Sequence, residues 1–372
     1  MKKIFIITER RADYSRFKPI MNLIKKDYYL DYILVVTGAH LRKEMGYTKD
    51  EILRDGFKID YEIDMFKDDS DSGGAMVRSF SRVAEKVTFC LEESSPDLIL
   101  AGFDIGANLA VTIAGAHMNI PVAHIQGGEV TGTIDESIRH AMTKFSHYHF
   151  ASNEDALNRL VKLGEVRERI FNVGCPSIDA ILDTPDNPDI LNKYNLSKDN
   201  YFILLQHPVT SEMEESKHQI QTTLSAIDKS KINVLIILPN NDAGFSEIIK
   251  ELKNSKINYV ESLGISDYIN LLKRSSGLIG NSSSGIHETS TFNIPTVNIG
   301  SRQAGRLRPK NVFDVDHNEK QIVLAINKCI EFKRNKIKVK NPYGDGKSAS
   351  RIIEIIKKID LANKIIQKTI TY

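Results

Sequence analysis

Residues 280–288, with the sequence GNSSSGIHE, combine the residue types that bind anionic groups. They follow an apolar run at 276–279 that predicts a strand, and they lead into a run at 286–292 that predicts a helix. Such a turn directs backbone N–H groups and serine hydroxyls at one point, which suits a diphosphate. The Gly-Lys-Ser/Thr ending of an NTP-hydrolysing loop is missing. Glu288 is placed to accept hydrogen bonds from a ribose, although an ordinary serine-rich helix cap is the alternative.

Acidic side chains follow two neighbouring predicted strands in the first half of the chain. Asp104 comes after one strand, Glu129 follows a Gly-Gly turn after the next, and Asp135 and Glu136 open a predicted helix. Paired carboxylates in a cleft suit general acid/base chemistry, because their mutual repulsion raises one pKa into a useful range. Acidic residues also favour the first turn of a helix, which accounts for Asp135 and Glu136 better than for Glu129.

Cationic and polar residues follow other predicted strands. Arg11 lies in a turn after the first strand, where a guanidinium could contact a phosphate in bidentate fashion or belong to a solvated loop. The turn lacks the GxGxxG fingerprint of dinucleotide-binding dehydrogenases. His207 ends a strand in the second half and could act as acid, base or phosphate ligand. Asn240 could contact a base edge, and Arg302 could neutralise a phosphate.

Alternating apolar strands and amphipathic helices must position these residues. The expected strands of the first half cover 3–8, 32–37, 59–63, 98–102, 121–125, 148–151 and 170–173. The helices between them cover 16–26, 49–55, 76–93, 107–118, 134–145 and 154–163. The alternation restarts with strands at 201–206, 234–239, 259–262, 277–280 and 296–299. Strands that are apolar on both faces predict an α/β fold with parallel sheets covered by helices on both sides.

The pattern divides the chain into two Rossmann-like domains. The first covers 1–182, a linker rich in Pro, Asp and Asn covers 183–200, and the second, nucleotide-binding domain covers 201–347. The final segment, 348–372, begins with a helix expected to reach about residue 366 and to pack back on the first domain. Two doubly wound domains joined in this way direct the carboxyl ends of both sheets toward a common cleft, where ligands bind.

Composition excludes several classes of protein. The 372 residues carry a formal net charge of +2, so no broad field favours nucleic acid or an anionic membrane. Apolar runs are too short to span a bilayer, and the N-terminus shows no secretory pattern. Cys90, Cys175 and Cys329 share no metal-ligand spacing. These features predict a cytoplasmic protein.

Taken together, these motifs resemble the hydrolysing UDP-N-acetylglucosamine 2-epimerases, almost from end to end. The matching segments are RADYS at 11–15, HIQGGEVTGTIDESIRH at 124–140, GCPSID at 174–179, LQHPVT at 205–210, PNNDAG at 239–244, GNSSSG at 280–285, GSRQAGR at 300–306 and YGDG at 343–346. The resemblance implies a GT-B fold, a homodimer or homotetramer, and no metal or redox cofactor. It also implies a nucleotide-sugar substrate that loses UDP and a proton from the acetamido-bearing carbon, then takes up water.

The resemblance also implies which residues act. Substrate contacts would come from Arg11, Ser15, His207, Asn240, Ile265, Ser282, Ser283, Glu288 and Arg302. Catalytic groups would come from Asp104, Glu129, Asp135, Glu136, Asp179 and His207.

Two departures from the family pattern affect the expected chemistry. Many members have Gly-Asp-Arg where this chain has Phe103-Asp104-Ile105, so a cation is missing. Many also have an acid at the place of Gln126, and an amide cannot accept a proton at neutral pH. That role would pass to Glu129, Glu136 or Asp135.

The expected reaction converts UDP-N-acetylglucosamine and water to N-acetylmannosamine and UDP. One alternative is the same reaction on UDP- or GDP-N,N'-diacetylbacillosamine. Others are a GT-B glycosyltransferase and a non-catalytic nucleotide-sugar binding protein, although neither needs several acids around the anomeric carbon.

Overall fold

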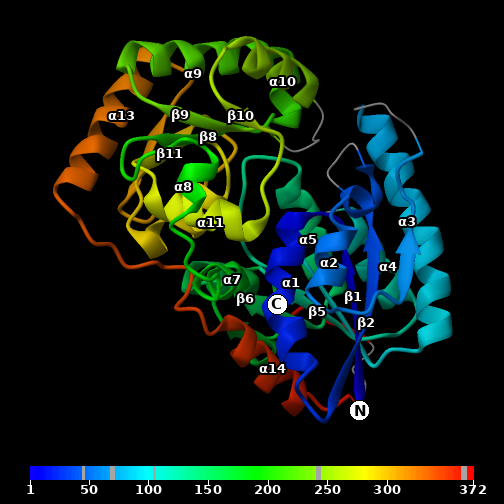
Figure 1. Ribbon diagram of the computed structural model, residues 1–372. Coiled ribbons are helices and arrows are strands. Elements are labelled where there is room, and N and C mark those ends of the chain that lie inside the picture. Colours follow the sequence, from blue (N-terminus) through cyan, green and yellow to red (C-terminus); the bar gives the residue numbers. More distant parts are fainter. Residues whose placement is uncertain (44–46, 68–71, 104–105, 240–243, 362–366) are drawn as a thin grey trace. The chain divides into compact units, whose positions relative to one another are not determined.

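The computed structural model describes residues 1–43, 47–67, 72–103, 106–239, 244–361 and 367–372. The chain forms two compact units (Figure 1). Unit 1 contains Met1–Glu129, Asp135–Ala180 and Tyr343–Tyr372, and unit 2 contains Val130–Ile134 and Ile181–Pro342. The chain therefore passes from unit 1 to unit 2 after Ala180 and returns to unit 1 at Tyr343. In addition, the five residues that directly follow Glu129 belong to unit 2.

Unit 1 is built on a seven-stranded parallel sheet with the order β3-β2-β1-β4-β5-β6-β7. Its strands are β1 (Lys2–Thr8), β2 (Leu30–Thr37), β3 (Tyr61–Ile63), β4 (Leu98–Gly102), β5 (Val122–Ile125), β6 (Tyr148–Ala151) and β7 (Ile170–Asn172). Its helices are α1 (Arg11–Ile24), α2 (Lys49–Arg54), α3 (Gly73–Ser94), α4 (Gly106–His117), α5 (Asp135–Phe145), α6 (Glu154–Lys162), α7 (Pro176–Leu182, which ends in unit 2) and α14 (Ser348–Lys358).

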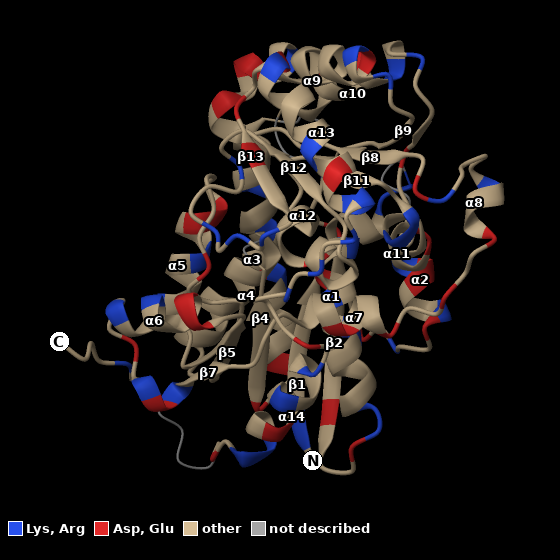
Figure 2. Ribbon diagram, turned by 90° about the vertical axis from the view of Figure 1, so that its left-hand side faces the viewer, with Lys and Arg blue, Asp and Glu red and all other residues tan. Residues whose placement is uncertain are grey.

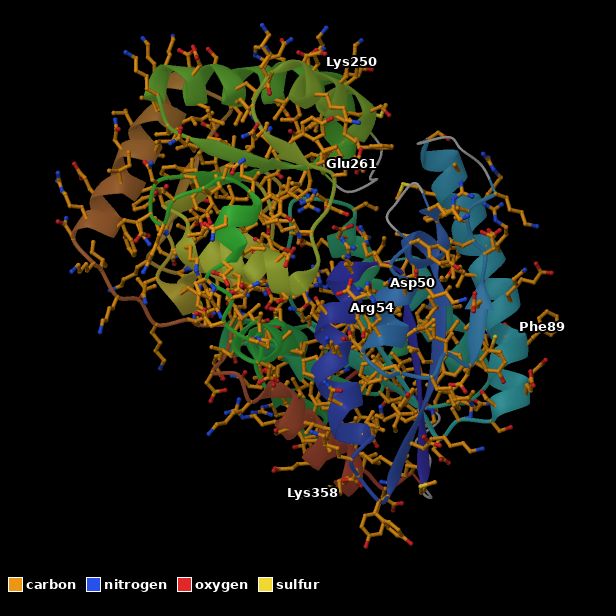
Figure 3. All side chains as sticks on the ribbon, viewed as in Figure 1. Asp50, Arg54, Phe89, Lys250, Glu261 and Lys358 are labelled. Atoms are coloured by element: carbon orange, nitrogen blue, oxygen red, sulfur yellow. The ribbon has the colours of Figure 1, made fainter. Side chains whose placement is uncertain are left out.

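Helices cover both faces of this sheet. In β1, Ile4 and Ile6 belong to an apolar cluster with α1 and α14, whereas Phe5 and Ile7 belong to a second cluster with α3 and α4. Successive strand residues point to opposite faces, so this division identifies a doubly wound sheet. On the outer face of α3, Phe89 projects away from the unit and is 64% exposed (Figure 3).

The C-terminal helix α14 packs on unit 1 through Ile352, Ile353 and Ile356, which are buried in the α1 cluster. The ammonium of Lys2 donates to the carbonyls of Ile356 and Ile359 at its C-terminal end. The helix ends at Lys358, which is labelled in Figure 3, and is therefore shorter than the sequence predicts. Ile359 is extended, and residues 362–366 of the predicted helix lie outside the described residues.

Unit 2 is built on a six-stranded parallel sheet with the order β10-β9-β8-β11-β12-β13. Its strands are β8 (Phe202–Leu205), β9 (Val234–Ile237), β10 (Tyr259–Val260), β11 (Gly277–Gly280), β12 (Thr296–Ile299) and β13 (Val312–Val315). Its helices are α8 (Ile190–Lys193), α9 (Ser216–Ser230), α10 (Phe245–Asn254), α11 (Ile265–Arg274), α12 (Ser284–His287) and α13 (Glu319–Arg334).

The structure of unit 2 differs from the prediction in two places. The edge strand β13 was not predicted, and the helix expected at 286–292 is instead the single turn α12 followed by a 3-10 turn at Thr289–Phe292. No helix in the described part of the chain is long and apolar enough to cross a bilayer. Figure 2 shows basic and acidic residues interspersed along the outer helices, as expected for a net charge of +2.

Candidate active site

The turn after β11 holds together the ends of three strands in unit 2. Gly280 adopts φ +129°, and a Cβ there would lie 2.1 Å from the carbonyl oxygen of Leu205 on β8, so the close approach requires glycine. The buried amide of Asn281 accepts a hydrogen bond from the His207 N–H at 2.7 Å and donates to the His207 carbonyl at 2.8 Å. The Asn281 carbonyl accepts from Gln303 at 2.8 Å.

Because β8 and β12 both flank β11, these bonds bring His207, Ser282 and Arg302 to one end of the sheet. Arg302 donates to the Asn281 carbonyl at 3.3 Å. The arrangement supplies a guanidinium, a histidine and serine groups at the carboxyl ends of parallel strands. Donors in this position suit an anionic ligand such as a diphosphate.

The serine residues of this turn lead to a buried carboxylate. The Ser284 N–H donates to the Ser282 hydroxyl at 3.3 Å, and the Ser284 hydroxyl donates to Glu288 at 2.7 Å. The hydroxyl of Tyr268 on α11 lies 2.5 Å from the Ser284 hydroxyl, and burial together with the Glu288 charge raises the pKa of Tyr268. Ile265 begins the same helix. Glu288 is thus held by Ser284, which in turn contacts Tyr268. Neither Ser284 nor Tyr268 was predicted as a site residue.

A hydrogen bond between Glu212 and Ser301 connects the loop after β8 with the loop after β12. Glu212 follows the His207 segment and accepts a hydrogen bond from the Ser301 hydroxyl at 2.5 Å and one from Gln219 at 2.7 Å. Ser301 immediately precedes Arg302. Glu212 therefore connects the loop that bears His207 with the loop that bears Arg302, and sequence analysis missed it.

Residues 130–134 lie on the loop that carries Arg302. Arg306 donates to the Val130 carbonyl at 2.9 Å, and the Gly132 N–H donates to the Arg302 carbonyl at 3.2 Å. A Cβ at Gly132 would lie 2.1 Å from the Ser301 carbonyl oxygen, so this backbone contact also requires glycine.

Replacing Ser282 and Ser283 together by alanine is expected to weaken UDP binding. Hydrogen bonds to charged groups contribute about 1.5–3 kcal/mol each, so the double change should raise the UDP dissociation constant at least about tenfold. Isothermal calorimetry with UDP measures the effect. The matched control changes Ser230 and Ser255, which end α9 and cap the C-terminus of α10. These helix ends lie at the edge of the sheet opposite to the strand ends, so UDP affinity should not change. Equal affinities in both double variants would exclude the two serines from the UDP site.

In unit 1, helix α1 begins at Arg11, five residues earlier than predicted. Asp13 fixes this start, because its buried carboxylate accepts hydrogen bonds from the N–H groups of Glu9 at 2.7 Å and Arg10 at 2.8 Å. Burial raises the pKa of Asp13 to about 6, although these two bonds oppose the shift. The cap places Arg11 in the first turn of the helix, directly after β1.

Arg11 and Ser15 have partners within unit 1. The Arg11 Nε lies 3.1 Å from the Glu51 carboxylate on α2, and the Ser15 hydroxyl donates to the Ala12 carbonyl at 3.0 Å. The Arg11 side chain remains about one-third exposed, so its charge faces solvent at the carboxyl end of the sheet.

The turn after β5 presents Glu129, whose carboxylate is buried. Gln126 adopts φ +61° and donates to the sulfur of Cys175 at 2.9 Å, so its amide lies among buried groups. Gly128 adopts φ +78°, and a Cβ there would lie 2.2 Å from a backbone oxygen of α6. Glu129 is 4% exposed, and its carboxylate accepts a hydrogen bond from Asn153 at 2.8 Å. Asn153 was not among the residues predicted from the sequence.

Asp135 and Glu136 form the first turn of α5, as expected, and they are less enclosed than Glu129. The Glu136 side chain is 38% exposed and lies 3.6 Å from the Nε2 of His140. Burial and the neighbouring Arg139 lower the pKa of His140, which favours its neutral form at neutral pH. Among these three acids, Glu129 therefore has the best enclosed carboxylate.

Asp179 lies beside the start of α14. Its buried carboxylate accepts hydrogen bonds from the N–H groups of Ser348 at 3.1 Å and Ala349 at 2.8 Å, which caps the start of α14. Asp104 and Asn240 lie outside the described residues. Within the described part of the chain, no cluster of three or more His, Cys, Asp or Glu side chains could hold a metal ion.

Comparisons with known proteins identify the family of the chain. A family model described as UDP-N-acetylglucosamine 2-epimerase matches residues 22–357. A UDP-N,N'-diacetylbacillosamine 2-epimerase (hydrolyzing) from Legionella pneumophila is 35% identical and covers 100% of both chains. A UDP-N-acetylglucosamine 2-epimerase from Neisseria meningitidis is 32% identical over 99% of this chain and 98% of its own.

Among solved structures, the Methanocaldococcus jannaschii UDP-GlcNAc 2-epimerase in complex with UDP-GlcNAc and UDP matches with a TM-score of 0.83. It is 20% identical and covers 96% of this chain and 100% of that chain, so it supports the fold alone. The α/β fold with two parallel sheets matches these epimerases and confirms the expected GT-B class. With a family model that spans most of its length and relatives above 30% identity over nearly all of it, the chain belongs to the UDP-N-acetylglucosamine 2-epimerase family.

Proposed function

We propose that this protein is a hydrolysing 2-epimerase that acts on a UDP-linked 2-acetamido sugar. The observation that carries the proposal is the full-length similarity to a relative named as a hydrolysing 2-epimerase. The geometry supports it from two sides. Unit 1 holds a buried carboxylate at Glu129, and unit 2 gathers anion-binding groups at the carboxyl end of its sheet.

In the proposed mechanism, Glu129 removes the proton from the acetamido-bearing carbon, C2. The bond from C1 to the diphosphate oxygen breaks, its electron pair leaves with UDP, and a double bond forms between C1 and C2. Water then adds its oxygen to C1 and loses one proton, while a second acid gives a proton to C2 from the opposite face and is restored by the proton from water. Glu129 releases the proton that it removed to solvent. The products are UDP and a free sugar that is inverted at C2, so atoms and charge balance.

The remaining residues bind the nucleotide and support the departing charge. Arg302 and the serine groups at Ser282 and Ser283 would stabilise the diphosphate as it leaves, because charge develops there in the transition state. Glu288 would accept hydrogen bonds from the ribose hydroxyls. Further substrate contacts would come from Arg11, Ser15, His207, Asn240 and Ile265. Supporting acid/base groups would come from Asp104, Asp135, Glu136, Asp179 and His207.

Two sugars are the main candidates. UDP-N-acetylglucosamine would give N-acetylmannosamine, which was the first expectation from the sequence. UDP-N,N'-diacetylbacillosamine, or its GDP counterpart, is the second candidate, and the higher identity to the Legionella relative favours it. Both have an acetamido group at C2, so the same elimination and hydration apply.

Turnover in heavy water is expected to place one deuterium at C2 of the product. The protein would be incubated with UDP- and GDP-linked forms of both sugars, and NMR would identify the product and its deuterium content. We expect a free reducing sugar, inverted at C2, without any acceptor. A glycosyltransferase would leave the C2–H bond intact and would need an acceptor. Full turnover without deuterium would exclude the elimination mechanism, and the preferred donor decides between the sugars.

A further inference from the structure

We propose that Asn153 is a positioning residue that orients the Glu129 carboxylate and stabilises its ionised form. The inference rests on the proposed function of Glu129 as the base. Asn153 lies between β6 and α6, directly before the helix, and its side chain is 5% exposed. Its Nδ2 donates to Glu129 Oε1 at 2.8 Å.

The orientation of the Asn153 amide is determined by a second bond. Its Oδ1 accepts a hydrogen bond from the Ala156 N–H at 2.8 Å, so Asn153 is the N-cap residue of α6. With the oxygen committed to the helix, the NH₂ group must point to the other side, where Glu129 lies. A flipped amide would place its nitrogen against a donor and its oxygen against a carboxylate, and both bonds would be lost.

The backbone next to Glu129 is fixed from two helices. Arg139 on α5 donates to the Glu129 carbonyl at 3.0 Å, and Arg159 on α6 donates to the Gly128 carbonyl. Gly128 has no room for a side chain. With the peptide held in this way, the position of the Glu129 carboxylate depends on its side-chain torsions, and the bond from Asn153 restricts them.

Asn153 also acts on the charge of Glu129. A hydrogen bond donated to a carboxylate favours its ionised form, which is the form that a base requires. Glu129 has cationic neighbours in Arg139 and Arg159, which bond the backbone beside it.

Other ionisable groups lie on the elements packed around this turn. Asp155 on α6 pairs with Arg159 at 2.7 Å, and Glu136 and His140 pair on α5. The Cys175 thiol lies beyond Gln126. Asn153 is uncharged, so replacing it can alter the charge next to Glu129 without removing any of these groups.

The test replaces Asn153 by aspartate. Aspartate is as good an N-cap as asparagine, so α6 should form normally. The repulsion between the two buried carboxylates should lower the unfolding temperature at neutral pH, and circular dichroism checks that the variant stays folded. The variant cannot donate to Glu129 and places a second carboxylate beside it, which raises the pKa of the pair. We expect the acid limb of the kcat/KM profile to move up by about one pH unit or more. The kcat at neutral pH should fall at least about tenfold, with unchanged UDP affinity.

The matched control is Asn172→Asp. Asn172 donates to Glu154 at 3.3 Å in an exposed pair on the same unit, so the chemical change is identical but solvent screens it. Its pH profile should match that of the wild type. Asn153→Ser serves as a second variant, because serine caps the helix but is too short to reach Glu129. It should lower kcat without moving the acid limb as far.

An acid limb that stays in place in Asn153→Asp, with wild-type kcat, would overturn the inference and leave the proposed function standing. If the wild type turned over no sugar, the proposed function would fail instead. The contact between Asn153 and Glu129 would then be decided by the titration of Glu129, followed by NMR of ¹³C-labelled carboxyl groups and assigned with Glu129→Gln. A Glu129 pKa that is equal in wild type and Asn153→Asp would also overturn the inference.

Discussion

Glu129→Gln is expected to lower kcat by a factor of about 10² to 10⁴ and to leave UDP affinity nearly unchanged. Glutamine cannot accept a proton at neutral pH, but its side-chain oxygen can still accept the hydrogen bond from Asn153. The variant should therefore fold and bind like the wild type while losing proton abstraction. Steady-state kinetics with the preferred donor, together with calorimetric titration of UDP, separates these two effects.

Glu136→Gln is the matched control for this prediction. Glu136 is the other glutamate that the sequence offers as a base, but it is 38% exposed and lies next to His140. Its replacement should change kcat far less than that of Glu129. Near-native turnover in Glu129→Gln would contradict the assignment and move the role of base to Asp104 or Asp135.

The strands that carry the site could be predicted because they are short apolar runs in a parallel sheet with both faces covered. β4 and β11 contain only aliphatic residues and glycine, and β1 is apolar from Ile4 to Ile7. β13 was missed because it is a partly exposed edge strand that contains a charged residue, Asp314. Its four residues, VFDV, form neither a continuous apolar run nor a strict apolar–polar alternation, so neither strand pattern identifies it.

Helix boundaries were less predictable, and tertiary contacts explain the differences. Proline is best tolerated in the first turn of a helix, so Pro19 favours a start near residue 16, yet the cap from Asp13 starts α1 at Arg11. After β11, the bond from Ser284 to Glu288 accompanies a single helical turn that continues as a 3-10 turn. Neither cap nor turn is visible in hydrophobic periodicity.

For the site, sequence patterns identified groups at strand ends but not their supports. Asn153, Glu212 and Tyr268 act through partners that are distant in sequence, so no local motif marks them. Asp179 shows what the folded chain adds to a motif: its place in a family motif predicts chemistry, which stays a prediction, and its contacts also cap a helix. Only the folded chain shows that this carboxylate bonds two N–H groups at a helix start.

Gly280→Ala is expected to destabilise the protein by about 2–6 kcal/mol. An alanine at φ +129° incurs strain of about 1–3 kcal/mol, and forcing an added carbon into a packed site costs about 1–3 kcal/mol more. The contact cannot relax easily, because the added Cβ meets backbone, the Leu205 carbonyl oxygen at 2.1 Å and its carbon at 2.6 Å. Denaturant unfolding measures the loss.

The control is Gly73→Ala at the start of α3, where an added Cβ meets nothing within 4 Å. There alanine should be neutral or stabilise by up to about 1 kcal/mol, because it restricts the unfolded chain without strain in the folded one. The two variants should also differ in UDP binding. Moving β11 away from Leu205 would displace Asn281 from its two bonds to His207 and separate the groups proposed to hold the diphosphate. If Gly280→Ala unfolded like the wild type and bound UDP equally well, the close approach of β11 to β8 could not be what organises this site.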